Sequence, residues 1–163
     1  MPIRVTLKLA TSLDGRIAMP TGESRWITGE AARAQGHRLR AGHEAILVGV
    51  ETVLADDPEL TVRFGKEGGD VAQPLRIVLD SRLRTPPSAK VASGITLILT
   101  ATEPHPIGSA EVVRVASADG RPTIDAVLAA LADSNITSVL IEGGGQVAAS
   151  FIRAGRVDRL EWF

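Results

Sequence analysis

Three consecutive glycines, Gly143–Gly145, separate an apolar run at residues 138–141 from a helical pattern, and this arrangement suits phosphate binding. Apolar side chains at residues 147–152 recur at helical spacing, and Gly155 is placed to end that helix. Glycines let a backbone approach a ligand closely, and the first N–H groups of a helix have no partner within it. The motif is neither G-x-G-x-x-G nor a Walker A loop. Because three glycines also fit a plain tight turn, both interpretations stay open.

Ser81 and Arg82 follow a predicted strand and bear on the choice of nucleotide. An NAD site usually offers a carboxylate to the ribose 2′-hydroxyl, whereas Ser and Arg suit a 2′-phosphate. Asp80 stands beside them and weakens the distinction, because its carboxylate fits the NAD pattern. The three residues together favour NADP over NAD.

A second polar tract places Asp56 and Asp57 before Pro58, with Arg63 shortly after. A carboxylate pair with an arginine suits a sugar hydroxyl and a phosphate. Asp-Pro is also common turn chemistry, and taken by itself the tract is better explained as a helix stop.

The remaining charged and aromatic residues give weaker signals. Arg33, Arg38 and Arg40 fall on one predicted helix, where most arginines are solvated. Trp26 fits either a core position or a stacking surface. The histidines lack metal-ligand spacing, so we predict surface or loop positions for them and no metal site. They are His37, His43 and His105.

Strands and helices alternate along the chain, which predicts an α/β fold with a largely parallel sheet. The strands are expected at residues 5–10, 45–48, 75–80, 95–100, 112–115, 138–141 and 159–163. The helices are expected at residues 29–41 with Thr28 as N-cap and Gly42 as end, 50–54, 123–133, and from the glycines to Gly155. Residues 20–24 and 65–74 are predicted loops. Ligands of such a sheet bind beyond the carboxyl ends of its strands, where the polar loops gather.

Composition places these elements in one soluble domain spanning residues 1–163. Of the 163 residues 44% are hydrophobic and 23% charged, and the net charge is −1. That charge gives no field to attract nucleic acid or an anionic membrane, so we expect neither as a partner. The chain has no cysteine, which excludes disulfides, thiolate zinc sites and cysteine nucleophiles. A cytoplasmic location is expected.

Several segments together resemble the reductase domain of the bifunctional riboflavin-biosynthesis deaminase–reductase. The matching segments are collinear, and they are residues 8–18, 22–28, 37–40, 53–63, 76–81 and 141–144. The resemblance implies a dihydrofolate-reductase-like three-layer α/β/α fold with a mostly parallel central sheet. It also implies NADPH-dependent reduction of the ribosyl group of 5-amino-6-(5-phosphoribosylamino)uracil to a ribityl group.

The resemblance also implies roles for individual residues. NADP(H) is expected to bind at Ala10, Trp26, Thr52, Asp56, Ser81, Gly144, Gly145, Gln146, Val147, Ala148, Ala149 and Ser150. The phosphorylated ribosylaminopyrimidine substrate is expected to bind at Ser24, Arg40, Leu60, Arg63 and Glu142. Asp56 and Lys8 are the candidate catalytic residues: Asp56 orients ribose hydroxyls or relays a proton, and Lys8 stabilises nearby charge.

Two departures from the family pattern leave alternatives open. The zinc deaminase half is absent because there is no cysteine, so a deaminase is expected only as a fused or separate partner. Relatives continue past Phe163 with strands that complete the sheet and take part in dimer packing. We therefore expect an exposed apolar edge here, with pairing into a homodimer, weak stability or inactivity. A dihydrofolate or pterin reductase and a truncated, non-catalytic NADP-binding module remain alternatives, and the deamination state of the substrate is open.

Overall fold

The computed structural model describes residues 2–11, 29–63 and 71–163. The expectations for Ser24 and Trp26, for the cap at Thr28, for the loop at 20–24 and for most of the loop at 65–74 lie outside these residues.

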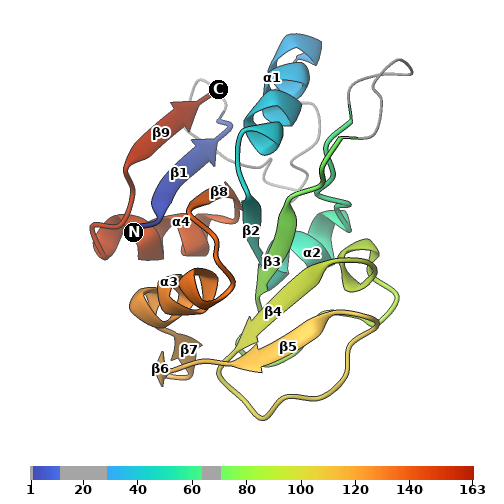
Figure 1. Cartoon of the computed structure of the whole chain (residues 1–163), viewed down its shortest axis with the longest axis vertical. Helices are drawn as coiled ribbons and strands as arrows, with labels where there is room; N and C mark the ends of the chain where they lie inside the picture. The colour runs from blue at the N-terminus through green and yellow to red at the C-terminus, as the bar shows by residue number, and fades with distance from the viewer. Residues whose placement is uncertain (1, 12–28, 64–70) are drawn as a thin grey trace.

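The described strands form a seven-stranded sheet in the order β5-β4-β3-β2-β8-β1-β9, and every neighbouring pair is parallel (Figure 1). Their bounds are β1 Arg4–Leu9, β2 Ala45–Gly49, β3 Leu75–Leu79, β4 Thr96–Thr100, β5 Glu111–Arg114, β8 Ser138–Gly143 and β9 Arg159–Trp162. β2 and β4 are buried along their whole length, as expected for strands covered on both faces. The predicted parallel α/β sheet is confirmed.

Four α-helices and a short 3₁₀ helix surround the sheet in the described chain: α1 Glu30–Ala41, α2 Val50–Asp56, α3 Ile124–Asp133, α4 Gly145–Arg153 and η1 Lys90–Ala92. The Thr123 side chain accepts a hydrogen bond from the Ala126 amide and caps α3. Gly155 (φ 63°) follows the end of α4, and its amide donates to the Ile152 carbonyl, which confirms its predicted role. The N-cap of α1 is Gly29, and the helix begins at Glu30, one residue after the predicted start.

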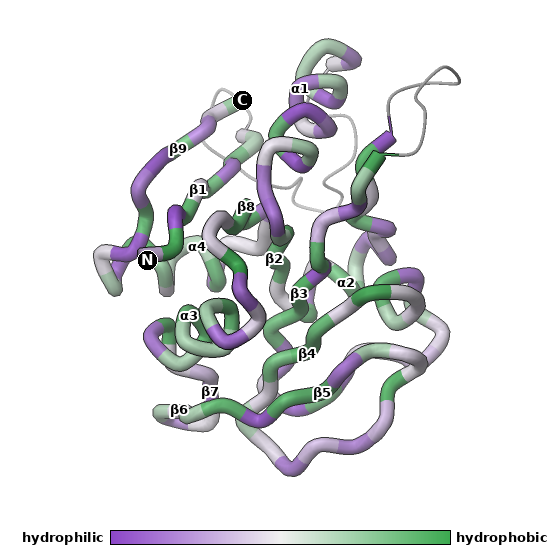
Figure 2. The backbone as a smooth tube through the Cα atoms, viewed as in Figure 1, coloured by the Kyte–Doolittle hydropathy of each residue, from purple (hydrophilic) through white to green (hydrophobic). Residues whose placement is uncertain are grey.

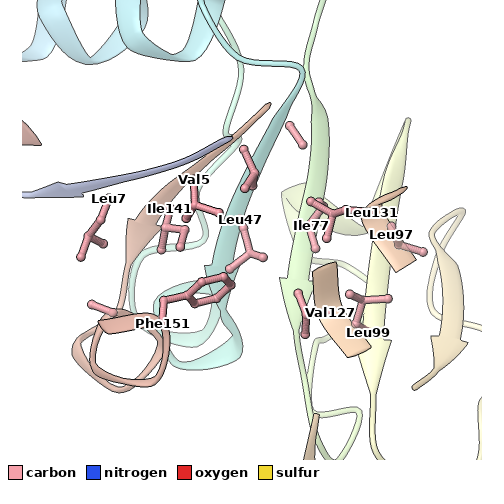
Figure 3. Packing of buried hydrophobic residues seen from close by; sticks show 13 residues of the cluster. Val5, Leu7, Leu47, Ile77, Leu97, Leu99, Val127, Leu131, Ile141 and Phe151 are labelled. Carbon is pink, nitrogen blue, oxygen red and sulfur yellow. The ribbon is translucent and has the colours of Figure 1, made fainter. Parts of the chain in front are cut away.

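Helices cover both faces of the sheet, which confirms the three-layer α/β arrangement. On one face α3 and α4 pack against the strands, with Phe151 lying near Leu47 and Val127 near Ile77 (Figure 3). On the other face α2 and η1 contribute Val53 and Val91 to a second buried cluster. Figure 2 shows green, hydrophobic central strands, whereas α1 is a mixture of purple, white and pale green residues.

A small antiparallel hairpin below α3 was not predicted (Figure 1). Its strands are β6 Ser117–Ala118 and β7 Arg121–Pro122. The two-residue turn has positive φ at both Asp119 (50°) and Gly120 (71°), as a type I′ turn requires. Asp-Gly is a strong signal for this turn, but strands of two residues leave no apolar alternation around it.

β9 lies at the edge of the sheet and pairs with β1 alone among the described strands. Leu160 and Trp162 of β9 are 50% and 66% exposed, so the predicted apolar edge is present. In the part of the chain that the structure describes, no helix has the length and hydrophobicity needed to cross a membrane.

Candidate functional site

A cleft of about 750 Å³ opens at the carboxyl ends of β2, β3 and β8. The sequence predicts that three polar segments meet there: residues 80–82, residues 142–145 and the segment after Val48. Each contributes lining residues, namely Ser81 and Arg82, Gly144 and Gly145, and residues 49–51, whereas Asp80, Glu142 and Gly143 do not line the cleft. The hairpin and the start of α3 form another wall through Arg121 and Ile124. Parallel strands thus bring residues from distant parts of the sequence to one binding surface.

The glycine turn passes close to α2. A Cβ placed on Gly143 would lie 3.2 Å from the Thr52 hydroxyl oxygen, and one on Gly144 would lie 3.5 Å from it. The peptide bond between the two glycines is cis. Gly144 is the N-cap of α4 and has no side chain to cap the helix, so the first amide groups of α4 remain available to an anion. Such uncapped amide groups at a helix start can bind a phosphate group, which a turn with a purely structural role does not need.

Close packing fixes the position of α4 relative to β2. A Cβ on Gly49 would lie only 2.8 Å from Cγ2 of Val147, so the Val147 side chain packs directly on the Gly49 backbone. Gly49 and Val147 both line the cleft. The start of α4 is consequently held against the end of β2 where the predicted cofactor site lies.

The turn after β3 points Asp80 inward and its neighbours outward. The Asp80 carboxylate is fully buried, and its Oδ2 accepts hydrogen bonds from the amide and the hydroxyl of Thr85, both at 2.7 Å. Ser81, Arg82 and Arg84 line the cleft instead. The Asp80 carboxylate is therefore not exposed to a ligand in the cleft. Its presence beside Ser81 no longer argues for NAD over NADP.

Arg84 and Glu51 form an ion pair across the cleft wall, and neither residue was singled out from the sequence. The hydrogen bond from Arg84 to Glu51 raises the pKa of the guanidinium further, and the charge of Asp80 adds to this effect. The residues are 33 positions apart, so no local pattern signals the contact.

A second cluster lies on the other side of the glycine turn, where Glu142 precedes Gly143. Arg40 donates from Nε to Oε1 of Glu142 at 2.6 Å and from Nη2 to Oε2 at 2.8 Å, and Nη1 donates to the Thr61 carbonyl at 3.0 Å. Burial acts to lower the pKa of Arg40, but the hydrogen bonds and charge of Glu142 outweigh burial and raise it. The two predicted substrate residues therefore form one charge-assisted pair.

Arg63 and His37 extend this cluster. Arg63 is exposed and contacts Glu59 at 3.3 Å, while its backbone amide donates to Nδ1 of His37 at 3.2 Å. Burial, together with the charges of Arg40 and Arg63, lowers the pKa of His37, which favours the neutral ring that this hydrogen bond needs. The expectation of a surface or loop histidine is corrected here, since His37 lies half-buried on α1.

His43 lies in the loop between α1 and β2, as predicted, and it is half-buried there. Its Nδ1 lies 2.6 Å from the Leu39 carbonyl and its Nε2 lies 2.9 Å from the Thr6 hydroxyl. Because a carbonyl only accepts, Nδ1 carries the proton and Nε2 accepts from Thr6. No cluster of metal-ligating side chains occurs within the described ranges.

Of the other predicted site residues, Leu60 and Ala148 are buried, whereas Lys8 and Asp56 are half-buried. Leu60 is buried in the core on the α2 face with φ 53°, so only its backbone can meet a ligand. Ala148 packs in the opposite core, and its amide donates to the Gly144 carbonyl, which places it away from the cleft surface. Lys8 lies on β1 under α1, with Nζ 5.7 Å from the centre of the Phe163 ring. Asp56 ends α2.

Among the predicted cofactor residues, those that line the cleft are Ser81, Gly144, Gly145, Gln146, Val147 and Ser150. Ala149 is half-buried on α4 and Ala10 follows β1, and neither lines the cleft. The sequence missed Glu51, Arg84 and Arg121 as lining residues.

Known proteins match this chain over nearly its whole length. The riboflavin biosynthesis protein RibD of Bacillus amyloliquefaciens is 40% identical over 167 residues, covering 98% of this chain and 44% of that protein. A solved RibD structure from Acinetobacter baumannii superposes with a TM-score of 0.85 at 34% identity, covering 98% of this chain and 45% of that one. A Thermotoga maritima structure has a TM-score of 0.81 at 34% identity, with 98% and 43% coverage.

The Thermotoga maritima protein is described as a diaminohydroxyphosphoribosylaminopyrimidine deaminase/5-amino-6-(5-phosphoribosylamino)uracil reductase. The present chain thus spans less than half the length of these relatives. A family model described as the RibD C-terminal domain matches residues 4–163. The family resemblance noted from the sequence is therefore confirmed, and the chain belongs to the RibD C-terminal domain family.

Proposed function

We propose that this chain catalyses NADPH-dependent reduction of the ribosyl group of 5-amino-6-(5-phosphoribosylamino)uracil to a ribityl group. The observation that carries the proposal is the glycine turn between two basic regions. Ser81 and Arg82 line the cleft on one side of it, and the Arg40–Glu142 pair lies on the other. A dinucleotide with its diphosphate on the turn would reach toward both. The reductase named in the description of the Thermotoga maritima protein acts on the same substrate.

The donors around the cleft fit NADP(H). The free amide groups at Gly145 and Gln146 suit the diphosphate, and Ser81 and Arg82 suit a 2′-phosphate. Thr52 packs against the turn and would hold it in place. When bound, the cofactor supplies a hydride to C1 of the opened ribosyl group. The protein contributes orientation and charge.

The Arg40 cluster suits a phosphorylated sugar. A guanidinium has five N–H donors, and the contacts of Arg40 to Glu142 and Thr61 use three of them. Two donors therefore stay available for a substrate phosphate. Arg63 is 63% exposed and offers a second guanidinium. Glu142 keeps the Arg40 fork oriented and is itself within reach of a polar substrate group.

Asp56 and Lys8 are proposed to act on the sugar. Asp56, at the end of α2, would orient the ribose hydroxyls or relay the proton that the pyrimidine-bound nitrogen takes up when C1 is reduced. Lys8 would stabilise negative charge near that position. Asp56 is half-buried and ends its helix, so its replacement by an isosteric amide should leave the fold intact.

The decisive experiment follows NADPH oxidation with the deaminated and undeaminated pyrimidines side by side, with dihydrofolate as a third substrate. We expect turnover of the deaminated uracil, and we expect Asp56→Asn to lower kcat by about 100-fold. Asp133→Asn is the matched control, because Asp133 also ends a helix and is exposed. Turnover of dihydrofolate alone, or NADPH binding without any turnover, would contradict the proposal. Undiminished activity of Asp56→Asn would remove that residue from the mechanism.

We also propose a cytoplasmic homodimer, with a zinc deaminase as a fused or separate partner. The exposed Leu160 and Trp162 at the sheet edge support pairing between copies. The deaminase named in the description of the Thermotoga maritima protein supports the second partner. Sedimentation of the full chain tests the dimer, and a monomer at all concentrations would contradict it.

A further inference from the structure

The β3 side of the cleft carries an ion pair that has been given no role above. Arg84, from the turn after β3, contacts Glu51 in the first turn of α2, and both side chains line the cleft. They are 46% and 64% exposed, so water and ligands reach them freely. An exposed pair of this kind adds little to stability. Its position in the cleft suggests a role in binding.

The order of groups around the glycine turn identifies what the Arg84–Glu51 pair would meet. Glu142, with Arg40, precedes the glycine turn, while Ser81 and Arg84 lie on the β3 side of it. If a dinucleotide diphosphate rests on the turn, the ribose carrying adenine extends toward the β3 side. This step rests on the proposed function, namely that the cleft binds a nicotinamide dinucleotide.

We propose that the Arg84–Glu51 pair determines the choice between NADPH and NADH. Arg84 is the cation that binds the adenosine 2′-phosphate, which carries more charge and more acceptor oxygens than the Glu51 carboxylate it replaces. Glu51 holds the guanidinium at the cleft wall until the cofactor arrives. Without Arg84, Glu51 is the free carboxylate that suits an unphosphorylated ribose.

Arg84 is better placed for this task than Arg121, and Arg82, which also lines the cleft, would add a second guanidinium to the same phosphate. Its neighbour Thr85 is fixed to the buried Asp80 carboxylate by two hydrogen bonds of 2.7 Å, so the backbone that carries Arg84 is held rigidly. Arg121 stands on a two-residue strand of a small hairpin, and the structure gives it no ion pair within the described residues. A rigidly held side chain loses less entropy on binding, so it discriminates more strongly between ligands.

The test measures equilibrium binding to the full chain by calorimetry. The ligands are NADPH, NADH, and the fragments adenosine 2′,5′-bisphosphate and adenosine 5′-phosphate. Arg84→Gln should raise the dissociation constant for NADPH and for the bisphosphate about 10-fold or more, and leave that for NADH unchanged or lower. Glu51→Gln should lower the constant for NADPH a few-fold by removing a repulsive charge, and raise that for NADH.

Matched controls come from the exposed Arg114–Glu103 pair, which lies on and beside β5 and does not line the cleft. Arg114→Gln and Glu103→Gln should change every dissociation constant less than twofold. Equal effects of Arg84→Gln on NADPH and NADH, or an effect no larger than that of Arg114→Gln, would overturn the assignment while leaving the reductase proposal intact. If the unaltered chain binds neither dinucleotide, the proposed function fails, and this inference fails with it.

Discussion

Arg40 and Glu142 are joined by two hydrogen bonds, at 2.6 and 2.8 Å, although they lie 102 positions apart in the sequence. Their side chains are 18% and 7% exposed, so each charge depends on the other for compensation. The pair links α1 to the end of β8, directly before the glycine turn. It therefore couples the proposed substrate side of the site to the strand that carries the cofactor turn.

Replacing Glu142 tests how much this pair contributes to the fold. Glu142→Gln should lower the free energy of unfolding by about 2 kcal/mol, because it leaves a half-buried guanidinium facing an amide. The measurement is urea unfolding of the ligand-free protein. Asp125→Asn breaks the exposed pair of Asp125 (77% exposed) with Arg156 (52% exposed) and should cost under about 1 kcal/mol. Equal losses in the two variants would contradict the special role of the Arg40 pair.

Gly49→Ala tests the contact that positions α4. The added methyl group would meet Cγ2 of Val147 at 2.8 Å, and the stiff β-branched side chain cannot rotate away without strain. We expect a loss of about 1–3 kcal/mol in unfolding free energy and weaker NADPH binding. The same change in a Val147→Ala background should cost clearly less, because the two sites couple. Additive losses would show that the clash is not the cause.

Thr85→Val tests the anchor of the turn after β3. The hydroxyl of Thr85 donates to Asp80 at 2.7 Å in a buried setting, so its removal should cost about 1–2 kcal/mol of unfolding free energy. Thr96→Val is a matched control. Thr96 is also buried, but its hydroxyl oxygen has no hydrogen-bond partner among the described residues, so this change should be neutral or stabilising. A larger loss for Thr96→Val would refute the hydrogen-bond argument.

His37 predicts a pH dependence of stability. Its pKa in the folded protein is lowered from 6.5 by burial and by the neighbouring Arg40 and Arg63 charges. As the pH falls through 6.5 toward the lower pKa of the folded state, the unfolded chain binds more protons than the folded one. The free energy of unfolding therefore decreases as the pH falls through this range. His37→Asn keeps an acceptor for the Arg63 amide and removes the titration. The midpoint temperature of thermal unfolding should therefore fall less steeply between about pH 8 and 5 in the variant than in the unaltered chain. Parallel curves would contradict the prediction.

Most of the sheet was predictable because its strands are short, continuously apolar runs. Residues 45–48 and 138–141 are buried along their length, so no alternation is needed to recognise them. The end of α4 was predictable because Gly155 adopts the positive φ that glycine accepts most readily. The helix stop at Asp56 was likewise read from the Asp-Pro tract, and Asp57 there adopts φ 41°.

The side-chain arrangement of the cleft was less predictable. Asp80 and Ser81 are adjacent, yet one faces the core and the other the cleft, and only the turn that Thr85 closes decides which. The Arg84–Glu51 contact joins two segments that meet through the β2–β3 pairing. Contacts of this kind depend on the register of neighbouring strands, and no local sequence pattern encodes that register.

The placement of β1 between β8 and β9 has a consequence for how the protein is made. Among the described strands β1 comes first in the sequence, and its described partners, β8 and β9, lie within residues 138–163, with Arg4 beside Ser138 and Thr6 beside Arg159. At about 5–20 residues per second, β1 must wait several seconds for its neighbours. The nascent chain therefore cannot close this half of the sheet during translation, and its apolar first strand is a natural target for chaperones until synthesis has passed β9.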